Sequence, residues 1–364
     1  PAVLSGLPFE VHHLFGELLN DQFERIGAPE RDLLLNRAAH WHLEHGTIDE
    51  ALHYAQRSGD FALAGRIALG HGPRLVRAGQ IDTLRAWIER STSDEITSDP
   101  AFSIAAAGVA ALLGEAKAQR FVNAAEQFPL DGPSPDGASS LRSSLANVRS
   151  MIGHAGFVQM LADGRQVYEL ERAAHTPWMT GGCRAMGHAF VGLGQPGEAI
   201  PVLEEGLRIC AEFSIRGYQE VVFLGHLALA YIDLSEFTAA SNHVEEGSAI
   251  MRRTDVAQPL HALALWTAEA SVATRRGDLG RAQQALARVN QYLDLCAAMV
   301  WLQAEVAVRC AETSWESGDW ATATRLADRA RVAIERVPDS ETLTGRLTSA
   351  SRTATTTDSA SVLK

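Results

Sequence analysis

The 364-residue sequence has very little lysine and no excess of positive charge. Only Lys117 and Lys364 are present, so arginine carries nearly all the positive charge, and 44 acidic residues outnumber 32 basic ones. Binding to nucleic acid needs a concentrated basic face. A net charge of −12 therefore argues against nucleic acid as a partner of this segment.

The sequence also lacks an apolar run of about 18 residues, which a membrane-spanning helix requires. Its first residues, PAVLSGLPFEVHHLF, have neither the charged start nor the long apolar core of a signal peptide. The four cysteines form no C-x-x-C pair and lie in apolar, helix-like patterns; they are Cys183, Cys210, Cys296 and Cys310. We expect buried, reduced thiols in a cytoplasmic protein that makes no contact with membranes.

The motifs of common enzyme classes are missing as well. No G-x-x-x-x-G-K-[ST] phosphate loop occurs, and glycine is never followed by lysine. We find no nucleophile elbow, no kinase motif set and no convergent pair of acids. The sequence therefore predicts a protein that is not an enzyme, binds no nucleotide and needs no cofactor.

A repeat is present instead. GLGQPGEA, DLSEFTAA, RRGDLGRA and ESGDWATA place turn residues at Gly194, Ser235, Gly277 and Gly318, which are 41, 42 and 41 residues apart. Weaker copies have their turns at Gly46, Gly79, Gly114 and Gly156. Self-similarity at this period is typical of helical solenoids, in which each repeat is a pair of helices.

The details of each unit support two helices joined at the glycine. Before the turn, apolar residues recur at helical spacing, as in VVFLGHLALAYIDL over 221–234. After the turn, Asp278 or Asp319 is placed to cap the next helix. Small residues recur five and twelve positions after the turn, which indicates a close neighbouring helix; they are Ala199 and Gly206, Ala240 and Gly247, Ala323 and Ala330. Strand patterns are nearly absent, and FPLDGPSPDGASS (128–140) is the clearest loop.

One stretch carries a family resemblance. VHHLFGELLNDQFERIGAPERDLLLNRAAHWHLEHGTIDEALHYAQRSGDFALAGRIA (11–68) resembles the central region of large LuxR-type regulators of the maltose-activator (MalT-like) class. There, an HHLF helix closes a winged-helix module and an RAA-W---G---EA--HA---GD---A pattern opens a tetratricopeptide-like sensor domain. The pattern is met by Arg37, Ala38, Ala39, Trp41, Gly46, Glu50, Ala51, His53, Ala55, Gly59, Asp60 and Ala64, and AGQIDTLRAWIERS (78–91) resembles the next unit.

Together with the repeats, the resemblance implies an all-α, tetratricopeptide-like, right-handed solenoid of about eight antiparallel helix pairs. It divides the chain into a remnant of the winged-helix module (1–28), the sensor domain (29–338) and a disordered linker (339–364). The linker would lead to a helix-turn-helix domain, and ATP hydrolysis and DNA binding would belong to parts of the parent protein outside this chain.

Two short motifs have competing interpretations. GLGQPG (192–197) matches the dinucleotide fingerprint G-x-G-x-x-G, but a helix-like segment precedes it where a strand is required, so we interpret it as a repeat turn. HWHLEH (40–45) is similar to a zinc-hydrolase motif. His40 and His42 would point about 200° apart on a helix, so a packing or surface role is favoured and no metal site is predicted.

The inner face of the first helices carries mixed aromatic, charged and histidine side chains, a composition suited to a ligand pocket. The candidate residues are Arg184, His188, Tyr218, Val222, His261, Trp301, Glu305 and Arg309. The alternative is an ordinary solvated groove without a specific ligand.

Two functions remain open at this point. The first is a sensor domain of a transcriptional regulator, in which a small-molecule inducer or a regulatory protein occupies the concave groove. The second is a helical-repeat scaffold that binds a protein or peptide and no metabolite. Both allow self-association of the chain.

Overall fold

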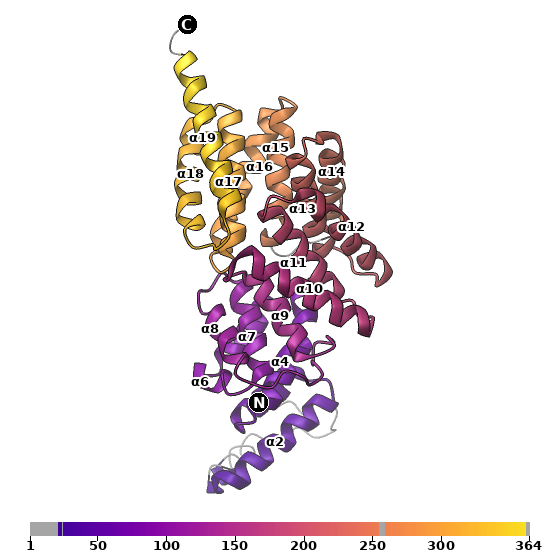
Figure 1. Cartoon of the computed structure of the whole chain (residues 1–364). Coiled ribbons are helices and arrows are strands. Elements are labelled where there is room, and N and C mark those ends of the chain that lie inside the picture. The colour runs from indigo at the N-terminus through magenta and orange to yellow at the C-terminus, as the bar shows by residue number, and fades with distance from the viewer. Residues whose placement is uncertain (1–20, 24, 255–258, 362–364) are drawn as a thin grey trace.

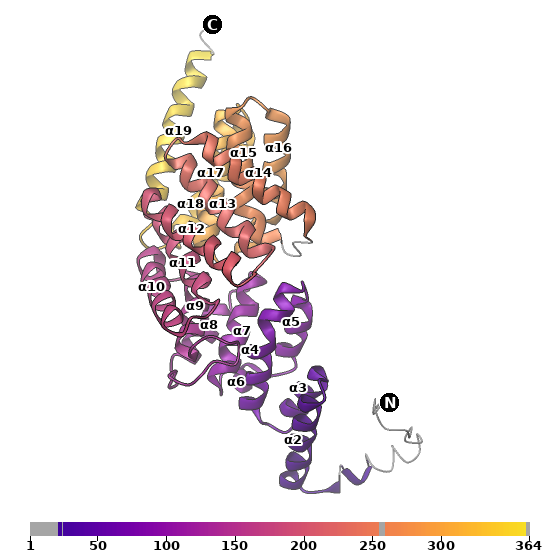
Figure 2. The same cartoon turned by 90° about the vertical axis from the view of Figure 1, so that its right-hand side faces the viewer.

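The computed structural model describes residues 21–23, 25–254 and 259–361 of the chain (Figures 1 and 2). Within these residues every regular element is a helix and none is a strand, so the predicted all-α class is confirmed. The HHLF segment and most of the predicted 1–28 remnant lie outside the described residues.

The helices form consecutive antiparallel pairs stacked into a solenoid, which runs from α2 at one end to α15–α19 at the other (Figure 1). The described pairs are α2 (Ala28–Glu44) with α3 (Ile48–Arg57), α4 (Phe61–Arg77) with α5 (Ile81–Glu89), α7 (Pro100–Leu112) with α8 (Ala118–Ala125), α9 (Leu141–Ile152) with α10 (Gly156–Ala174), α11 (Met179–Gly192) with α12 (Pro196–Glu212), α13 (Tyr218–Asp233) with α14 (Phe237–Arg253), α15 (Leu263–Arg275) with α16 (Leu279–Tyr292), and α17 (Val300–Glu316) with α18 (Trp320–Ile334). Short helices α6 (Ser93–Ile96), η1 (Pro259–Ala262) and η2 (Leu293–Cys296) connect some of them, and α19 (Glu341–Ser361) follows the last pair.

All eight predicted turn residues adopt a left-handed backbone conformation, with φ between 63° at Ser235 and 88° at Gly156. At Gly194 this conformation lets the amides of Gly194 and Gln195 donate back to the carbonyls of Val191 and Phe190, at 3.0 and 2.8 Å, and so ends α11. The turn between α9 and α10 is more complex, because Gly153 is left-handed in addition to Gly156.

Capping and close packing follow the predicted pattern. The carboxylates of Asp278 and Asp319 accept hydrogen bonds from the third residues of α16 and α18, Arg281 and Thr322. Small residues five and twelve positions after the turns are buried in every unit where they were predicted. A methyl group on Gly206 would come within 2.3 Å of the Phe223 ring, so this helix contact tolerates no side chain.

The solenoid closes on itself, because its last repeats contact turns of much earlier ones. The backbone carbonyl of Leu295 in η2 lies so close to Gly114 that a Cβ there would be 2.9 Å away. The amide of Val158 at the start of α10 donates to the carboxylate of Asp339, at 3.3 Å. The first helices α9, α11, α13 and α17 therefore lie around a common interior.

The C-terminal segment differs from our expectation of a disordered linker over 339–364. Residues Glu341–Ser361 form helix α19, whose first half packs on α17 and α18. Leu343 and Leu347, one helical turn apart, are both buried, and Arg346 between them pairs with Glu312 on α17. The low apolar content of this segment suggested disorder, but two leucines and the ion pairs of Arg346 with Glu312 and Asp233 anchor its first turns.

Several other predictions hold. All four cysteines are free and buried. Residues 128–140 form no helix and connect α8 to α9. No described helix is long and apolar enough to span a membrane.

Candidate functional site

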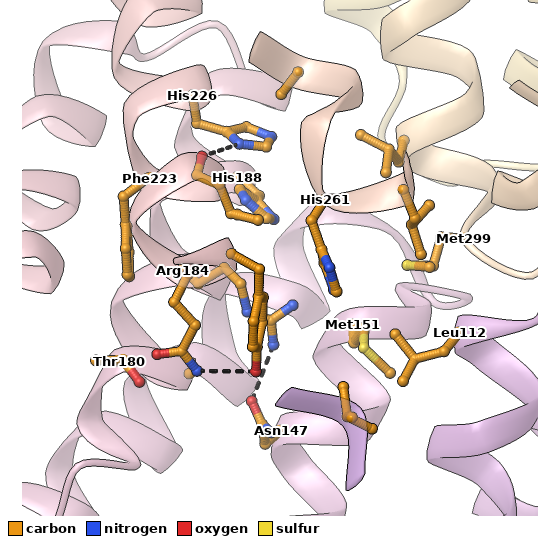
Figure 3. Close-up of a pocket in the computed structure, with 18 of the residues that line it drawn as sticks. Leu112, Asn147, Met151, Thr180, Arg184, His188, Phe223, His226, His261 and Met299 are labelled. Carbon is orange, nitrogen blue, oxygen red and sulfur yellow. Dashed lines mark hydrogen bonds between the residues drawn. The ribbon is translucent and has the colours of Figure 1, made fainter. Parts of the chain in front are cut away.

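The interior of the closed solenoid contains a cavity of about 160 Å³ (Figure 3). Its walls come from α9, α11, α13, η1 and α17, with Val76 of α4 and Leu112 of α7 completing one side. The first helices of successive repeats face this space. Residues four apart lie on the same face of a helix, so they line the same wall.

Six of the eight candidate residues line this cavity. They are Arg184 and His188 on α11, Tyr218 and Val222 on α13, His261 on η1, and Trp301 on α17. The prediction that these side chains share one inner surface therefore agrees with the geometry, whereas their role in binding a ligand remains a prediction.

The walls of the cavity are built from stacked rings. The rings of Tyr218 and His261 stack with their centroids 4.3 Å apart. On the other side His188 lies between His226 and Trp301, with centroid distances of 3.8 and 4.8 Å. Such rings offer flat surfaces to an aromatic or apolar ligand.

The three histidines of the cavity are held in the neutral form. Burial lowers the pKa of His188 well below its usual value, and His226 and Arg184 lower it further. Burial also lowers the pKa of His226, although Glu305 acts in the opposite direction. The pKa of His261 falls to about 4, because burial and the nearby Arg184 both disfavour its charged form.

Arg184 brings a positive charge to the cavity wall. Its Nη2 donates to Oδ1 of Asn147 on α9, at 3.0 Å. Gly181 makes room for this pair, since a Cβ at that position would lie 2.3 Å from the same oxygen. Burial lowers the pKa of Arg184, and the phenol of Tyr218, whose own pKa is raised by burial, is close enough to influence it.

Trp301 supports the cavity as much as it lines it. Its side chain is 1% exposed, packs edge-on against Phe157, and donates from Nε1 to the carbonyl of Met151 at 2.9 Å. It also contacts the turn at Gly153, where a Cβ would come within 2.4 Å of the indole. Trp301 is therefore a core residue that joins α17 to the end of α9.

Glu305 and Arg309 do not line this cavity, although Arg309 lines a second groove, and their role in binding a ligand stays a prediction. They form a buried ion network beneath it on α17, with Arg309 Nε donating to Glu305 at 3.1 Å and its two Nη atoms to Asp233 at 2.8 and 2.7 Å. Both side chains are almost fully buried. Helical periodicity could not show that Asp233, which also pairs with Arg346, neutralises Arg309.

The charges of this network stabilise one another. Burial by itself would raise the pKa of Asp233, but Arg309 and Arg346 outweigh it and lower this pKa to about 2. Burial would likewise lower the pKa of Arg309, but Asp233 and Glu305 raise it above its usual value. The network therefore ties α17 to α13 and, through Arg346, to α19.

Sequence reasoning missed several residues that line the cavity, among them Asn147, Met151, Trp178, His226 and Met299. His226 lies four residues after Val222 on the same helix face, so the spacing already used for that helix would have found it. Asn147 and Met151 lie in α9, whose repeat has a divergent turn, and no signal in the sequence placed them.

The two ambiguous motifs fold as repeat segments. Gly192 ends α11 and Pro196 begins α12, so GLGQPG follows a helix and no strand precedes it. In HWHLEH, the Nδ1 atoms of His40, His42 and His45 each bond within the same repeat, to Asn36, Thr47 and Trp41. Across the described residues, no three His, Cys, Asp or Glu side chains gather in a way that could hold a metal ion.

The fold and the cavity define the class of protein: a tetratricopeptide-like helical solenoid that closes around an internal space. A solved structure of a Rap protein complexed with competence and sporulation factor is similar to 75% of this chain, with a TM-score of 0.54, 13% sequence identity and coverage of 76% of that chain. At this identity the likeness shows the fold alone.

In sequence, part of the chain is similar to a transcriptional regulator. The chain is 34% identical over 103 residues to the HTH-type transcriptional regulator MalT of Vibrio campbellii (strain ATCC BAA-1116), and 32% identical over 103 residues to MalT of Vibrio parahaemolyticus serotype O3:K6 (strain RIMD 2210633). Each match covers 28% of this chain and only 11% of the relative. No protein-family model matches the chain. The chain thus has weak homology to MalT-type regulators, on a tetratricopeptide-like fold.

Proposed function

We propose that this chain is the effector-sensing domain of a transcriptional regulator of the MalT-like class, and that the effector is a small molecule held in the cavity between α9, α11, α13 and α17. The observation that carries the proposal is the cavity itself, an inner space lined by stacked aromatic rings and by the polar side chains of Arg184, His188 and His226. The domain acts by binding and not by catalysis, and DNA and ATP are bound by other parts of the regulator.

The way the walls are assembled supports a sensing role. The cavity is bounded by helices from repeats that are distant in sequence, and Trp301 and the Arg309 network join those repeats behind it. A ligand that fits one arrangement of these helices better than another shifts the equilibrium between the two arrangements. Such a shift is what a regulator needs in order to respond to an inducer.

The test is a thermal-shift screen of small molecules, combined with native mass spectrometry of the chain purified from its host. A true effector at about 100 times its dissociation constant stabilises the fold by about 2.7 kcal/mol, which raises the melting temperature by several degrees. Val222→Phe fills the cavity and should abolish the shift, whereas Val158→Phe, on the exposed side of α10, should retain it. A ligand that stabilises both variants equally binds outside the cavity and contradicts the proposal.

A second candidate is a scaffold that binds a peptide or protein segment. An open groove of about 680 Å³ runs beside α13, α15, α17 and α19, with the half-exposed Trp320 and an Arg275–Glu316 ion pair on its sides. An open, polar groove of this kind suits an extended polypeptide better than a small molecule. In a peptide-library binding assay, this function predicts hits whose affinity falls in Trp320→Ala and is unchanged in Val222→Phe.

A further inference from the structure

Arg184 is a partly buried cation without an acidic partner. Across the described residues no carboxylate lies within 4.0 Å of its guanidinium, which has Asn147 as its hydrogen-bonding partner. The other arginines that reach the interior are neutralised differently. Arg149 pairs with Asp163 and Glu126, and Arg309 pairs with Asp233 and Glu305.

An unpaired charge that is partly removed from water carries a desolvation cost, and a bound anion offsets it. The planar guanidinium of arginine fits a carboxylate or phosphate with two parallel hydrogen bonds. The remaining ionisable groups of the wall, His188, His226, His261 and Tyr218, are all neutral near pH 7, since burial lowers the pKa of each histidine and raises that of the tyrosine. The single positive charge of Arg184 therefore balances one negative charge on a ligand. A carboxylate is a better match for it than a doubly charged phosphate.

The size and walls of the cavity limit the rest of the ligand. Its volume of about 160 Å³ is close to that of an engineered apolar cavity of about 150 Å³ that takes up benzene. The Tyr218–His261 stack and the His188–Trp301 contact contribute aromatic rings to its walls. A single ring therefore fits this space.

The polar groups of the cavity are distributed toward two ends. Figure 3 shows Arg184 and Asn147 at one end, and His188 and His226 at the other. Nδ1 of His226 bonds to the carbonyl of Val222 at 3.0 Å and must donate there, so its buried Nε2 is an acceptor, and this atom has no partner. Nε2 of His188 is also buried without a partner. The histidine end therefore suits a hydrogen-bond donor such as a hydroxyl group.

We infer that the cavity binds a small aromatic monocarboxylate, with the carboxylate on Arg184 and a ring hydroxyl at the His188–His226 pair. This assignment rests on the proposed sensing function and adds the chemical class of the effector. It explains why the fold keeps an arginine in this wall, where an aliphatic side chain would otherwise pack at lower cost.

The test uses calorimetric titration of the whole chain with 4-hydroxybenzoate, and with two close analogues. Benzoate lacks the hydroxyl, and 4-hydroxybenzamide has the same shape without the charge. We expect saturable binding of 4-hydroxybenzoate, binding about tenfold weaker for benzoate, and binding about a hundredfold weaker for the amide.

Two variants of Arg184 test the contribution of its charge separately from that of the shape of the cavity. Arg184→Gln should weaken 4-hydroxybenzoate about a hundredfold and leave the amide unchanged, with Arg184→Lys in between. The matched control is Arg208→Gln, an exposed arginine on α12, which should bind all three compounds like the wild type. A melting curve of ligand-free Arg184→Gln should show no loss of stability, because the substitution removes an unpaired, partly buried charge.

The possible failures are distinguishable. If the amide binds as tightly as the acid, Arg184→Gln has no effect, and Val222→Phe blocks both, then the cavity is a ligand site but the carboxylate class is wrong. If none of the aromatic acids binds at millimolar concentration, the inference is overturned. If, in addition, no compound of the broad screen responds to Val222→Phe, the sensing function is overturned too.

Discussion

The N-terminal repeats (α2–α8) and the C-terminal repeats (α9–α18) use the same helix-pair unit but differ in what they bury. Among the described residues of the N-terminal repeats, Ser103 is the one fully buried polar side chain. The C-terminal repeats bury His188, His226, Glu305 and Arg309 as well as their apolar core. Polar groups inside a protein are costly unless they are satisfied or used.

The second helices show the same contrast. In the N-terminal repeats α3, α5 and α8 have 10, 9 and 8 residues, whereas α12 and α14 each have 17. The comparison indicates that stacking alone needs only short units with an apolar interior, whereas the C-terminal repeats, where we propose that the ligand binds, also bury polar side chains.

The largest expected effect comes from Trp301→Ala. Removing this buried indole and its bond to Met151 should lower the free energy of unfolding by about 3–5 kcal/mol. Chemical denaturation followed by circular dichroism measures it. The control is Trp320→Ala, whose side chain is 37% exposed and should cost less than about 1 kcal/mol. Equal effects in both variants would mean that the contact between α17 and α9 contributes nothing.

The second prediction concerns pH. The pKa of His261 is about 4 in the folded chain and 6.5 in the unfolded chain, so the unfolded chain binds more protons between these values. Stability is complete above pH 6.5 and should fall by about 3 kcal/mol for this group as the pH approaches 4. Unfolding titrations across this range should show a flatter pH dependence in His261→Phe, while the exposed His40→Gln keeps the wild-type slope. Arg184 and Tyr218 face His261, so neither of these two residues is substituted in the variants that are compared.

A third, smaller effect tests the close packing of the C-terminal repeats. Ala323→Leu forces a large side chain into a fully buried contact and should destabilise the chain by about 1–3 kcal/mol in thermal melts. Ala321→Leu, two residues earlier and exposed on the same helix, is the matched control. In the N-terminal unit, Leu84 occupies the equivalent position five residues after Gly79. We therefore expect a small residue to be required at this position in the regular repeats only.

The smallest effect compares helix caps in the two parts. Asp319→Ala should cost about 1 kcal/mol, and Asp319→Asn should cost little, because asparagine caps equally well. Asp60→Ala in the N-terminal repeats should cost more, since Asp60 also accepts a hydrogen bond from Asn36 at 2.6 Å. If Asp319→Ala proves the more damaging of the two, the additional bond to Asn36 has no value for stability.

Much of the fold could be predicted from the sequence, because each repeat is determined by local signals. A glycine that accepts a left-handed conformation, an aspartate cap and a small residue five positions later are all close together in the chain. Ser235 replaces glycine in one turn and still adopts φ of 63°, so the period was a better guide than the residue type. The same reasoning failed for 339–364, where Leu343 and Leu347 dock onto a partner that composition cannot reveal.

The candidate site was predictable only in part, for a related physical reason. Periodicity states which face of a helix turns inward, and this was enough for Arg184, His188, Tyr218 and Val222. It does not state which distant repeat comes to lie opposite. The burial of Arg309 against Asp233, and the presence of Asn147 beside Arg184, depend on contacts 76 and 37 residues apart.

The contact between Trp301 and Met151 has a consequence for how the chain folds and unfolds. In an open repeat array each unit touches only its neighbours, so unfolding begins at an end and proceeds unit by unit. Here a single hydrogen bond spans 150 residues of sequence, and the units between its two ends are held in a loop. Helices α9 to α17 should therefore exchange their amide protons in one cooperative opening, whereas α2 and α3, which lie outside the loop, exchange by fraying. Folding of the looped part must wait for its two ends to meet, so this part should form late and slowly for an all-helical protein.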